Sequence, residues 1–355
     1  MPCFTTTSAF VRSTVLAAAA CCAGIFSSVP VLGQGDKGGD LAKPEPQIVQ
    51  SLEGFPIAIT YYKAGGGKES PVVVLLHMKD GNRLVWEGDG GLAPALQKEG
   101  YAVITVDLRG HGDSKGSGIP AAVGAAAGNA NQKKKDEKEK KPAPKAAKGA
   151  PGEVKKGDVE AMIAYDLEVV KTFIYDKHQA AELNMNKLAV IGAEMGATVA
   201  LNFAANDLAK KPHSDGQAGF QTPRGQDVRA VVLLSPQTGF AGVPVNLALN
   251  ALRSPGADPN GGVAFLVCVT KKDSEDRGQA KKIFDQLETR DNKTRMNLKS
   301  FEGSHRGTNM LGKNLKSGQL TLEEFIMGFL ELHVKKLPPN WRDRQSKLEK
   351  KATAK

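Results

Sequence analysis

Long apolar runs rich in β-branched residues constrain the fold of this chain more than any other feature. Four of them read PVVVLLHM (71–78), YAVITVD (101–107), KLAVIG (187–192) and VAFLVCVT (263–270), and helical patterns lie between them. A strand that is apolar along its whole length is buried on both faces, and strands that alternate with helices pair in parallel. The sequence therefore predicts an α/β fold with a mostly parallel sheet.

The first 33 residues do not belong to this pattern. Arg12 precedes an apolar, Ala-rich run that ends in small residues at 31–33, as in a secretory signal peptide. Ser27, Ser28 and Pro30 interrupt the run, which argues against a membrane anchor, and no later apolar stretch is long enough to span a bilayer. We predict a signal peptide at 1–33, a polar linker at 34–46 and an exported protein, periplasmic or extracellular, with no transmembrane segment after cleavage.

Three of the four cysteines, Cys3, Cys21 and Cys22, lie in the segment that we expect to be removed. A lipoprotein site at Cys21 is an alternative, although the sequence lacks the Leu expected three residues earlier. Only Cys268 remains, so no internal disulfide is possible, and its apolar surroundings indicate a small buried side chain. No Cys or His stands beside it at ligand spacing, and we predict no metal site.

The net charge of +10 is concentrated in two segments. Residues 117–157 and 335–355 together contribute +12, which leaves the rest of the chain near −2. The first segment is low in complexity and lacks aromatic residues, so it cannot bury enough apolar surface to offset its ordering entropy. We predict a disordered insertion at 117–157 and a flexible basic C-terminal tail at 335–355. In an exported protein these basic segments would contact anionic envelope surfaces rather than nucleic acid.

Short motifs follow the strands in a fixed order. They read LLHMKDG (75–81), DLRGHGDS (107–114), GAEMG (192–196), TKKDSED (270–276) and EGSHRGT (302–308). In this order they resemble the α/β-hydrolase family, over roughly residues 48–334 apart from the insertion. The resemblance implies one α/β-hydrolase domain, placed here at 47–334, with a sheet of about eight strands. Only about 25 residues separate the strands RAVVLLS (229–235) and VAFLVCVT, too few for a full lid domain.

The resemblance also assigns the site residues. GAEMG occupies the nucleophile turn, where Gly192 and Gly196 are required because side chains there would collide, and it places Glu194 where the family usually has Ser. Asp273 and His305 match the acid and the base, with Asp276 as a second candidate for the acid. Met78 and Met195 fall at the oxyanion-hole positions, and Met78 stands where the family has Gly.

A carboxylate at this turn has two interpretations. At a helix N-terminus Glu194 should be ionised, lie within reach of His305 and fill the oxyanion hole, which predicts a pseudohydrolase that binds a small molecule or an envelope partner. The alternative is an active hydrolase of esters, amides or alkyl substrates, with Glu194 as nucleophile and His305 activating water. Relatives of that kind place Asp at the turn, and the extra methylene of Glu would misplace the oxygen by about 1 Å, a roughly hundredfold loss.

The remaining serines and histidines have structural interpretations. We expect Ser114 to be a turn residue and Ser235 to cap its local backbone, while Ser304 adjoins the base position in a loop. The strand-end histidines, His77 and His111, are expected to be satisfied structural groups, and the histidines outside any motif are interpreted as surface residues: His178, His213 and His333.

No cofactor is predicted. The segment VIGAEMGATVAL resembles a dinucleotide-binding turn, but Glu194 would stand at its second Gly and would block and repel a pyrophosphate. The sequence GGGK at 65–68 lacks the spacing of a phosphate loop.

Overall fold

The computed structural model describes residues 41–88, 90–116, 153–253, 262–338, 340–348 and 350. The chain divides into two units, Met1–Asp40 and Leu41–Lys355, and every described residue belongs to the second. The predicted signal peptide at 1–33 and residues 117–152 of the predicted insertion lie outside the described residues. The last five residues of that insertion are described, and helix α2 begins within them at Lys156.

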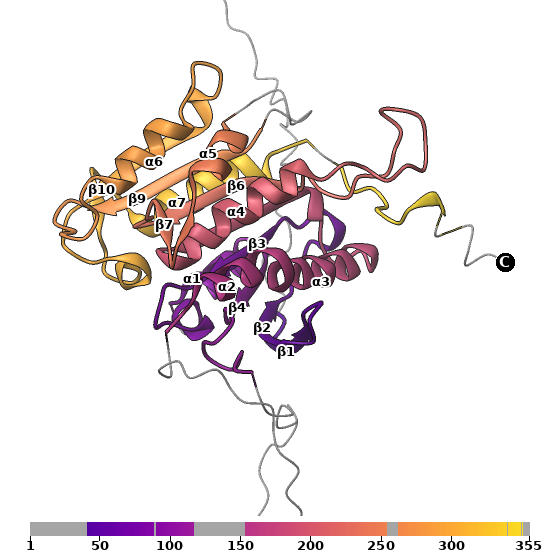
Figure 1. Ribbon diagram of the computed structural model, residues 1–355, viewed down its shortest axis with the longest axis horizontal. Coiled ribbons are helices and arrows are strands. Elements are labelled where there is room, and N and C mark those ends of the chain that lie inside the picture. The colour runs from indigo at the N-terminus through magenta and orange to yellow at the C-terminus, as the bar shows by residue number, and fades with distance from the viewer. Residues whose placement is uncertain are drawn as a thin grey trace, which may run out of the picture. The chain divides into compact units, whose positions relative to one another are not determined.

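The described unit is built on one eight-stranded sheet with the order β1-β2-β4-β3-β5-β6-β9-β10 (Figure 1). The first two strands are antiparallel to their neighbours, and all the others are parallel. The bounds are β1 Glu45–Gln50, β2 Pro56–Tyr62, β3 Val72–Leu76, β4 Ala102–Val106, β5 Leu188–Ala193, β6 Val228–Leu234, β9 Ala264–Thr270 and β10 Met296–Phe301. The predicted sheet of about eight mostly parallel strands is confirmed.

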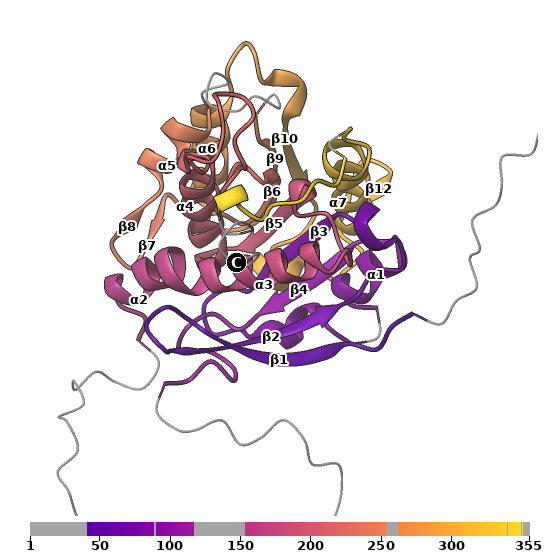
Figure 2. The ribbon, with the colours of Figure 1, turned by 90° about the vertical axis from the view of Figure 1, so that its right-hand side faces the viewer.

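Helices cover both faces of the sheet, as the edge-on view in Figure 2 shows. One layer packs on the larger apolar cluster and contains α2 Lys156–Ala161, α3 Leu167–Gln179, α4 Met195–Ala209, α5 Asn246–Leu252 and α6 Gln279–Leu287. The other layer contains α1 Leu92–Lys98 and α7 Leu322–Leu330. Every residue of the five central strands is buried, because each strand faces a helix layer on both sides.

Shorter elements join these layers. Two two-stranded sheets pair β7 Gly239–Phe240 with β8 Val243–Pro244 and β11 Lys316–Ser317 with β12 Leu320–Thr321. A π-helical turn at Met162–Asp166 joins α2 to α3, and another at Glu331–Lys335 follows α7. The 3-10 helices lie at Gly67–Glu69, Arg83–Trp86, Met185–Lys187, Lys293–Arg295 and Gly307–Met310.

Local sequence features account for several of these boundaries. The side chain of Thr321 accepts a hydrogen bond from the Glu324 N–H, and Glu324 accepts from the Thr321 N–H, so α7 begins with a capping box. Cys268 is fully buried in β9, and burial raises the pKa of its thiol. No helix among the described residues is long and apolar enough to cross a membrane.

The described part of the C-terminal segment packs on the domain, so its interpretation as a flexible tail is wrong for residues 341–346. The indole of Trp341 stacks on His178 with ring centroids 4.9 Å apart and donates to the His178 carbonyl oxygen at 3.0 Å. Arg344 is only 3% exposed and forms an ion pair with the buried Asp227. The segment is basic in composition, yet it is ordered because Asp227 and the face around His178 bind it.

His178 is a buried residue, so its interpretation as a surface residue is wrong. Its Nε2 lies 2.8 Å from the Arg342 carbonyl oxygen, and its Nδ1 lies 3.2 Å from the Met185 nitrogen. Because Nδ1 accepts from that N–H, the neutral ring donates through Nε2 to the C-terminal segment. The two other histidines of this group, His213 and His333, are half-buried.

Burial lowers the pKa of His178, which makes the stability of the domain sensitive to acid. The unfolded chain takes up a proton near pH 6.5, whereas the native ring takes it up only at lower pH, so the contribution of His178 is present above pH 6.5 and is lost as pH falls below it. In urea unfolding between pH 7 and pH 5, His178→Asn should show a smaller loss of stability than the wild type. An unchanged slope in His178→Asn, or an equal change in the control His213→Asn, would contradict this assignment.

Candidate functional site

The carboxyl ends of five parallel strands gather the candidate residues. Met78 follows β3, Glu194 follows β5 and Ser235 follows β6, while Asp273 follows β9 and the loop 302–308 follows β10. The carboxyl edge of an open parallel sheet is where ligand and catalytic sites of α/β proteins form. The candidate residues therefore lie together at the edge of the sheet where α/β proteins form their functional sites.

The turn at Glu194 has the strained backbone of a nucleophile elbow. Glu194 has φ 47° and ψ −106°, a conformation that L-residues rarely adopt, and it is the N-cap of α4. A Cβ on Gly192 would lie 2.3 Å from the Gly196 carbonyl oxygen, and one on Gly196 would lie 2.5 Å from the Leu76 carbonyl oxygen. Both glycines are therefore required, as predicted, and the turn is intact although its central side chain is a carboxylate.

Arg306 lies between Glu194 and Asp273. Its Nε is 2.7 Å from Oε1 of Glu194. The two groups form an ion pair, but the geometry of the Nε–H group does not meet that of a hydrogen bond. Its Nη1 donates to both carboxylate oxygens of Asp273, at 3.0 and 2.8 Å. The Arg306 side chain is 12% exposed, those of Glu194 and Asp273 are 15% and 2% exposed, and the exposed Glu275 is 3.6 Å away. One guanidinium thus joins the nucleophile and acid positions.

The charge balance of this cluster explains the state of Glu194. Burial raises the pKa of its carboxyl group, and the charge of Arg306 opposes the rise without cancelling it. The neighbouring carboxylates of Glu275 and Asp273 add to the rise. Glu194 therefore depends on Arg306 for its compensation, rather than on the helix N-terminus alone as the sequence suggested.

His305 forms no side-chain hydrogen bond or ion pair with this cluster. Its side chain is exposed, and within the described part of the chain its ring makes no hydrogen bond; only its carbonyl oxygen is used, as acceptor from the Thr270 hydroxyl at 2.7 Å. Glu194 and His305 are therefore not in contact, contrary to the expectation. Asp276, the second candidate acid, accepts from Gly278 and Ala280 N–H groups and so holds the start of α6.

The two candidate oxyanion-hole residues flank the elbow. Met195 is the first residue of α4, where helix geometry leaves a backbone N–H without an intrahelical acceptor, and its side chain is fully buried. Met78 is half-buried, and its sulfur would lie 2.8 Å from a Cβ on Gly307. The same Cβ would lie 3.2 Å from Oε1 of Glu194, so Gly307, with φ 55°, lets the loop after β10 approach both side chains.

The neighbouring polar residues have structural roles. His77 is fully buried: its Nδ1 contacts the Met78 carbonyl oxygen at 2.7 Å, its Nε2 accepts from the Leu108 N–H at 3.0 Å, and burial lowers its pKa to about 4. His111 is also buried, and its ring centroid lies 5.0 Å from that of His77. Ser114 accepts from the Ala58 N–H and donates to the Asp107 carbonyl oxygen, which agrees with its interpretation as a turn residue.

Ser235 forms a hydrogen bond with a residue distant in sequence, whereas the sequence suggested a bond to its local backbone. Its hydroxyl accepts from the Gly307 N–H at 3.1 Å, although Gly307 is 72 positions away along the chain, so it does not cap its own local backbone. Because Gly307 follows Arg306, this bond helps to fix the loop that carries the guanidinium. Ser304 is exposed.

Sequence reasoning missed Arg306 as a site residue. The available clue was charge: Glu194 and Asp273 were expected at one site, and two neighbouring carboxylates need a cation unless one is protonated. Arg306, next to His305 in EGSHRGT, was one of the candidate cations, together with Lys271 and Lys272 beside Asp273. No group of His, Cys, Asp and Glu among the described residues has the arrangement of a metal site.

Comparison with known proteins gives a family and a set of distant structural neighbours. The model of the alpha/beta hydrolase fold family matches residues 71–250. An esterase of Pyrococcus furiosus is 14% identical with a TM-score of 0.47, over 82% of this chain and 91% of that one. A predicted CIB-like hydrolase of Thermoplasma acidophilum is 12% identical with a TM-score of 0.46, over 82% of this chain and 97% of that one.

A third neighbour is the dienelactone hydrolase of Anabaena variabilis, 15% identical with a TM-score of 0.43, over 82% of this chain and 100% of that one. No curated protein matches the chain. The assignment therefore rests on the family model, which spans half of the chain, and on the sheet order and elbow described above. The chain belongs to the α/β-hydrolase fold family.

Proposed function

We propose that the protein is a pseudohydrolase, an α/β-hydrolase-fold protein that binds a ligand or partner instead of hydrolysing a substrate. The observation that carries the proposal is the position of Arg306 between Glu194 and Asp273. An arginine guanidinium has no acceptor site and keeps its proton in proteins, so it cannot act as the general base that the family places there. Glu194 is likewise engaged by a cation instead of being presented to a substrate carbon.

The position of His305 supports the same proposal. A hydrolase of the carboxylate type needs a base to activate the water that cleaves its covalent intermediate. The His305 ring is exposed, and it makes no hydrogen bond to Glu194 or Asp273. The carboxylate mechanism would require the loop after β10 to exchange Arg306 for His305, at the expense of the ion pairs described above.

A cavity of about 460 Å³ at the same edge of the sheet offers a place for a small molecule. It lies beside the turns after β3 and β4 and is lined by polar groups that include Asn82, Arg109 and His111. Its volume falls in the range of small-molecule sites. The proposed role is binding of a small molecule or an envelope partner at this edge, by a protein that we also propose to be exported.

Turnover is the direct test of this proposal. We expect the full chain to hydrolyse none of a panel of small esters, amides, epoxides and haloalkanes above the rate in buffer, and Glu194→Ala to behave identically. Glu275→Ala, which removes an exposed carboxylate beside the same guanidinium, is the matched control. A rate that disappears in Glu194→Ala but persists in Glu275→Ala would establish a working glutamate nucleophile and refute the pseudohydrolase.

A further inference from the structure

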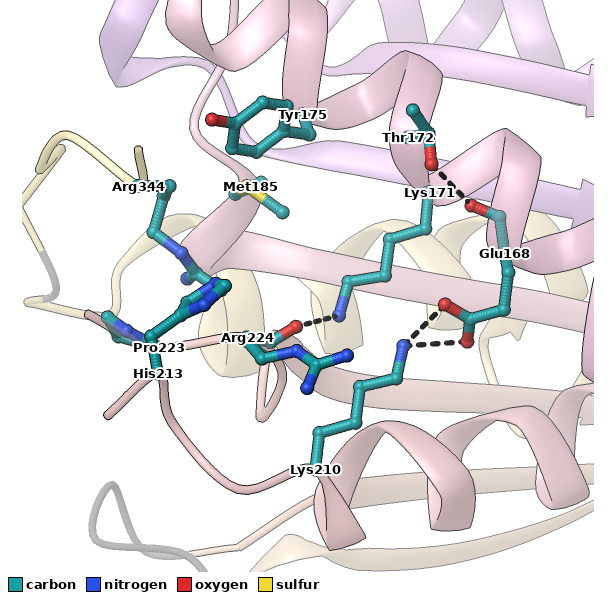
Figure 3. A pocket seen from close by; sticks show the side chains of 10 residues that line it. All are labelled: Glu168, Lys171, Thr172, Tyr175, Met185, Lys210, His213, Pro223, Arg224 and Arg344. Carbon is teal, nitrogen blue, oxygen red and sulfur yellow. Dashed lines mark hydrogen bonds and ion pairs between the residues drawn. The ribbon is translucent and has the colours of Figure 1, made fainter. Parts of the chain in front are cut away.

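A second cavity lies at the edge of the sheet opposite the elbow. It has a volume of about 230 Å³, and Met185 and Arg224, which precede the first residues of β5 and β6, contribute to its wall. Figure 3 shows side chains from α3, from the end of α4 and from the C-terminal segment converging on it. Four cations and a single carboxylate line it: Lys171, Lys210, Arg224, Arg344 and Glu168.

Three of these cations are engaged by carboxylates of the domain, and Arg344 is one of them through its ion pair with Asp227. Lys171 is buried and forms ion pairs with Asp207 and Asp227, and Lys210 contacts both carboxylate oxygens of Glu168, at 2.7 and 2.5 Å. These pairs fix the two amino groups in the wall of the cavity. They do not remove the positive potential there, because the four lining cations outnumber the three carboxylates that they contact.

Arg224 supplies a cation that none of the described residues neutralises. Its carbonyl oxygen accepts from Lys171 at 3.3 Å, but its guanidinium makes no hydrogen bond or ion pair with the described residues. Arg224 is exposed, and in Figure 3 its guanidinium points toward the space between the Lys171 and Lys210 amino groups. An exposed guanidinium without a partner among the described residues, at the mouth of a cationic cavity, is suited to bind an anion.

Arg344 adds a nearly buried cation to the wall. Its terminal nitrogens bind Asp227 and Asn186, whereas its Nε has no hydrogen-bond partner among the described residues although the side chain is almost fully buried. Arg344 also lines the cavity, so its guanidinium adds to the surplus of positive charge there, and an anion in the cavity would compensate that charge.

We propose that this cavity binds a phosphate group, free or as a small monoester. Arg and Lys together are the usual partners of phosphate oxygens, Arg through its planar fork and Lys as a point charge. Tyr175 and Met185 lie on the side of the cavity away from Lys210 in Figure 3, and their apolar surface suits the organic part of a monoester. The small volume excludes large ligands. This site is separate from the edge of the sheet that carries Glu194.

Calorimetric titration of the full chain with inorganic phosphate and with phenyl phosphate tests the proposal. Saturable binding is expected, weakened at least tenfold in Arg224→Gln and unchanged in Lys281→Gln, a control that removes an exposed lysine of α6 paired with Asp285. Tighter binding of phenyl phosphate would identify a monoester as the ligand, and equal binding would identify the phosphate group alone.

The proposal is overturned if neither compound binds saturably, or if Arg224→Gln and Lys281→Gln bind as the wild type does. The Arg224 guanidinium is exposed and has no partner among the described residues, so the unfolding temperature of Arg224→Gln without ligand should match that of the wild type, which separates lost binding from lost folding. With ligand, the wild type should unfold at a higher temperature that rises with phosphate concentration, and Arg224→Gln should not.

Discussion

Replacement of Arg344 by Ala should lower the free energy of unfolding by about 3–5 kcal/mol, the range for removing one partner of a buried ion pair. Asp227 is fully buried, and burial alone would raise its pKa, but the charges of Lys171 and Arg344 outweigh burial and hold the pKa below its usual range. Without Arg344, Asp227 keeps a single cation, which it shares with Asp207. A buried carboxylate would then be incompletely compensated.

Urea unfolding of the full chain at pH 7 measures this loss. Lys336→Ala is the matched control, because it removes an exposed cation of the same C-terminal segment, whose contact with Glu331 is worth at most about 1 kcal/mol. If Arg344→Ala were as stable as Lys336→Ala, the C-terminal segment would contribute little to folding, and the burial of Arg344 would not matter energetically.

Replacement of Arg306 by Ala should lower the free energy of unfolding by about 2–3 kcal/mol at pH 7, less than the full range for a buried pair because Glu194 is partly exposed. Removal of the guanidinium leaves Glu194 and Asp273 next to each other without their cation. The pKa of Glu194 is already raised by burial, and it should rise further once the opposing charge of Arg306 is gone.

The pH dependence gives this prediction its sign. In Arg306→Ala the native state should take up a proton at Glu194 at a higher pH than the unfolded chain does, so the deficit relative to the wild type should shrink as pH falls from 7 to 5. Lys271→Ala, which removes an exposed cation paired with Glu302, should cost under about 1 kcal/mol and show no such recovery. A deficit in Arg306→Ala that does not change with pH would contradict the role given to Glu194.

The fold could be predicted from sequence because its determinants are local. Continuous apolar runs such as VAFLVCVT predict strands that are buried on both faces. The glycines at 192 and 196 predict a close approach of strand and helix. The predicted end of the insertion, at residue 157, lies only one residue beyond the observed start of α2 at Lys156. These features follow from the spacing of residue types within about ten positions, which sequence patterns record well.

The arrangement of the site could not be predicted because it depends on contacts distant in sequence. Whether His305 or Arg306 faces Glu194 is a choice between adjacent residues of one loop, and it is associated with the bonds from Thr270 to the His305 carbonyl and from Gly307 to Ser235. The family resemblance favours His305, because a resemblance assigns roles by position in the motif. It does not take into account the charges of the surrounding residues.

The prediction of a flexible C-terminal segment was wrong for a related reason. The composition of the segment is basic and low in aromatic residues, which is typical of a solvated tail. No residue near it in the sequence indicates which part of the domain it would contact. Arg344 binds Asp227, 117 positions away, and Trp341 binds His178, 163 positions away. The distribution of charge along the sequence shows where the cations are. It does not predict which of them form an ion pair with a buried carboxylate.

A double-mutant cycle between Glu194→Gln and Arg306→Met tests the central claim most directly, namely that the carboxylate at the elbow serves to hold a cation. Unfolding free energies of the wild type, both single variants and the double variant give the coupling between the two side chains. We expect a favourable coupling of at least about 1 kcal/mol at pH 7. Additivity within about 0.5 kcal/mol would contradict it, since Glu194 would then be free for another role.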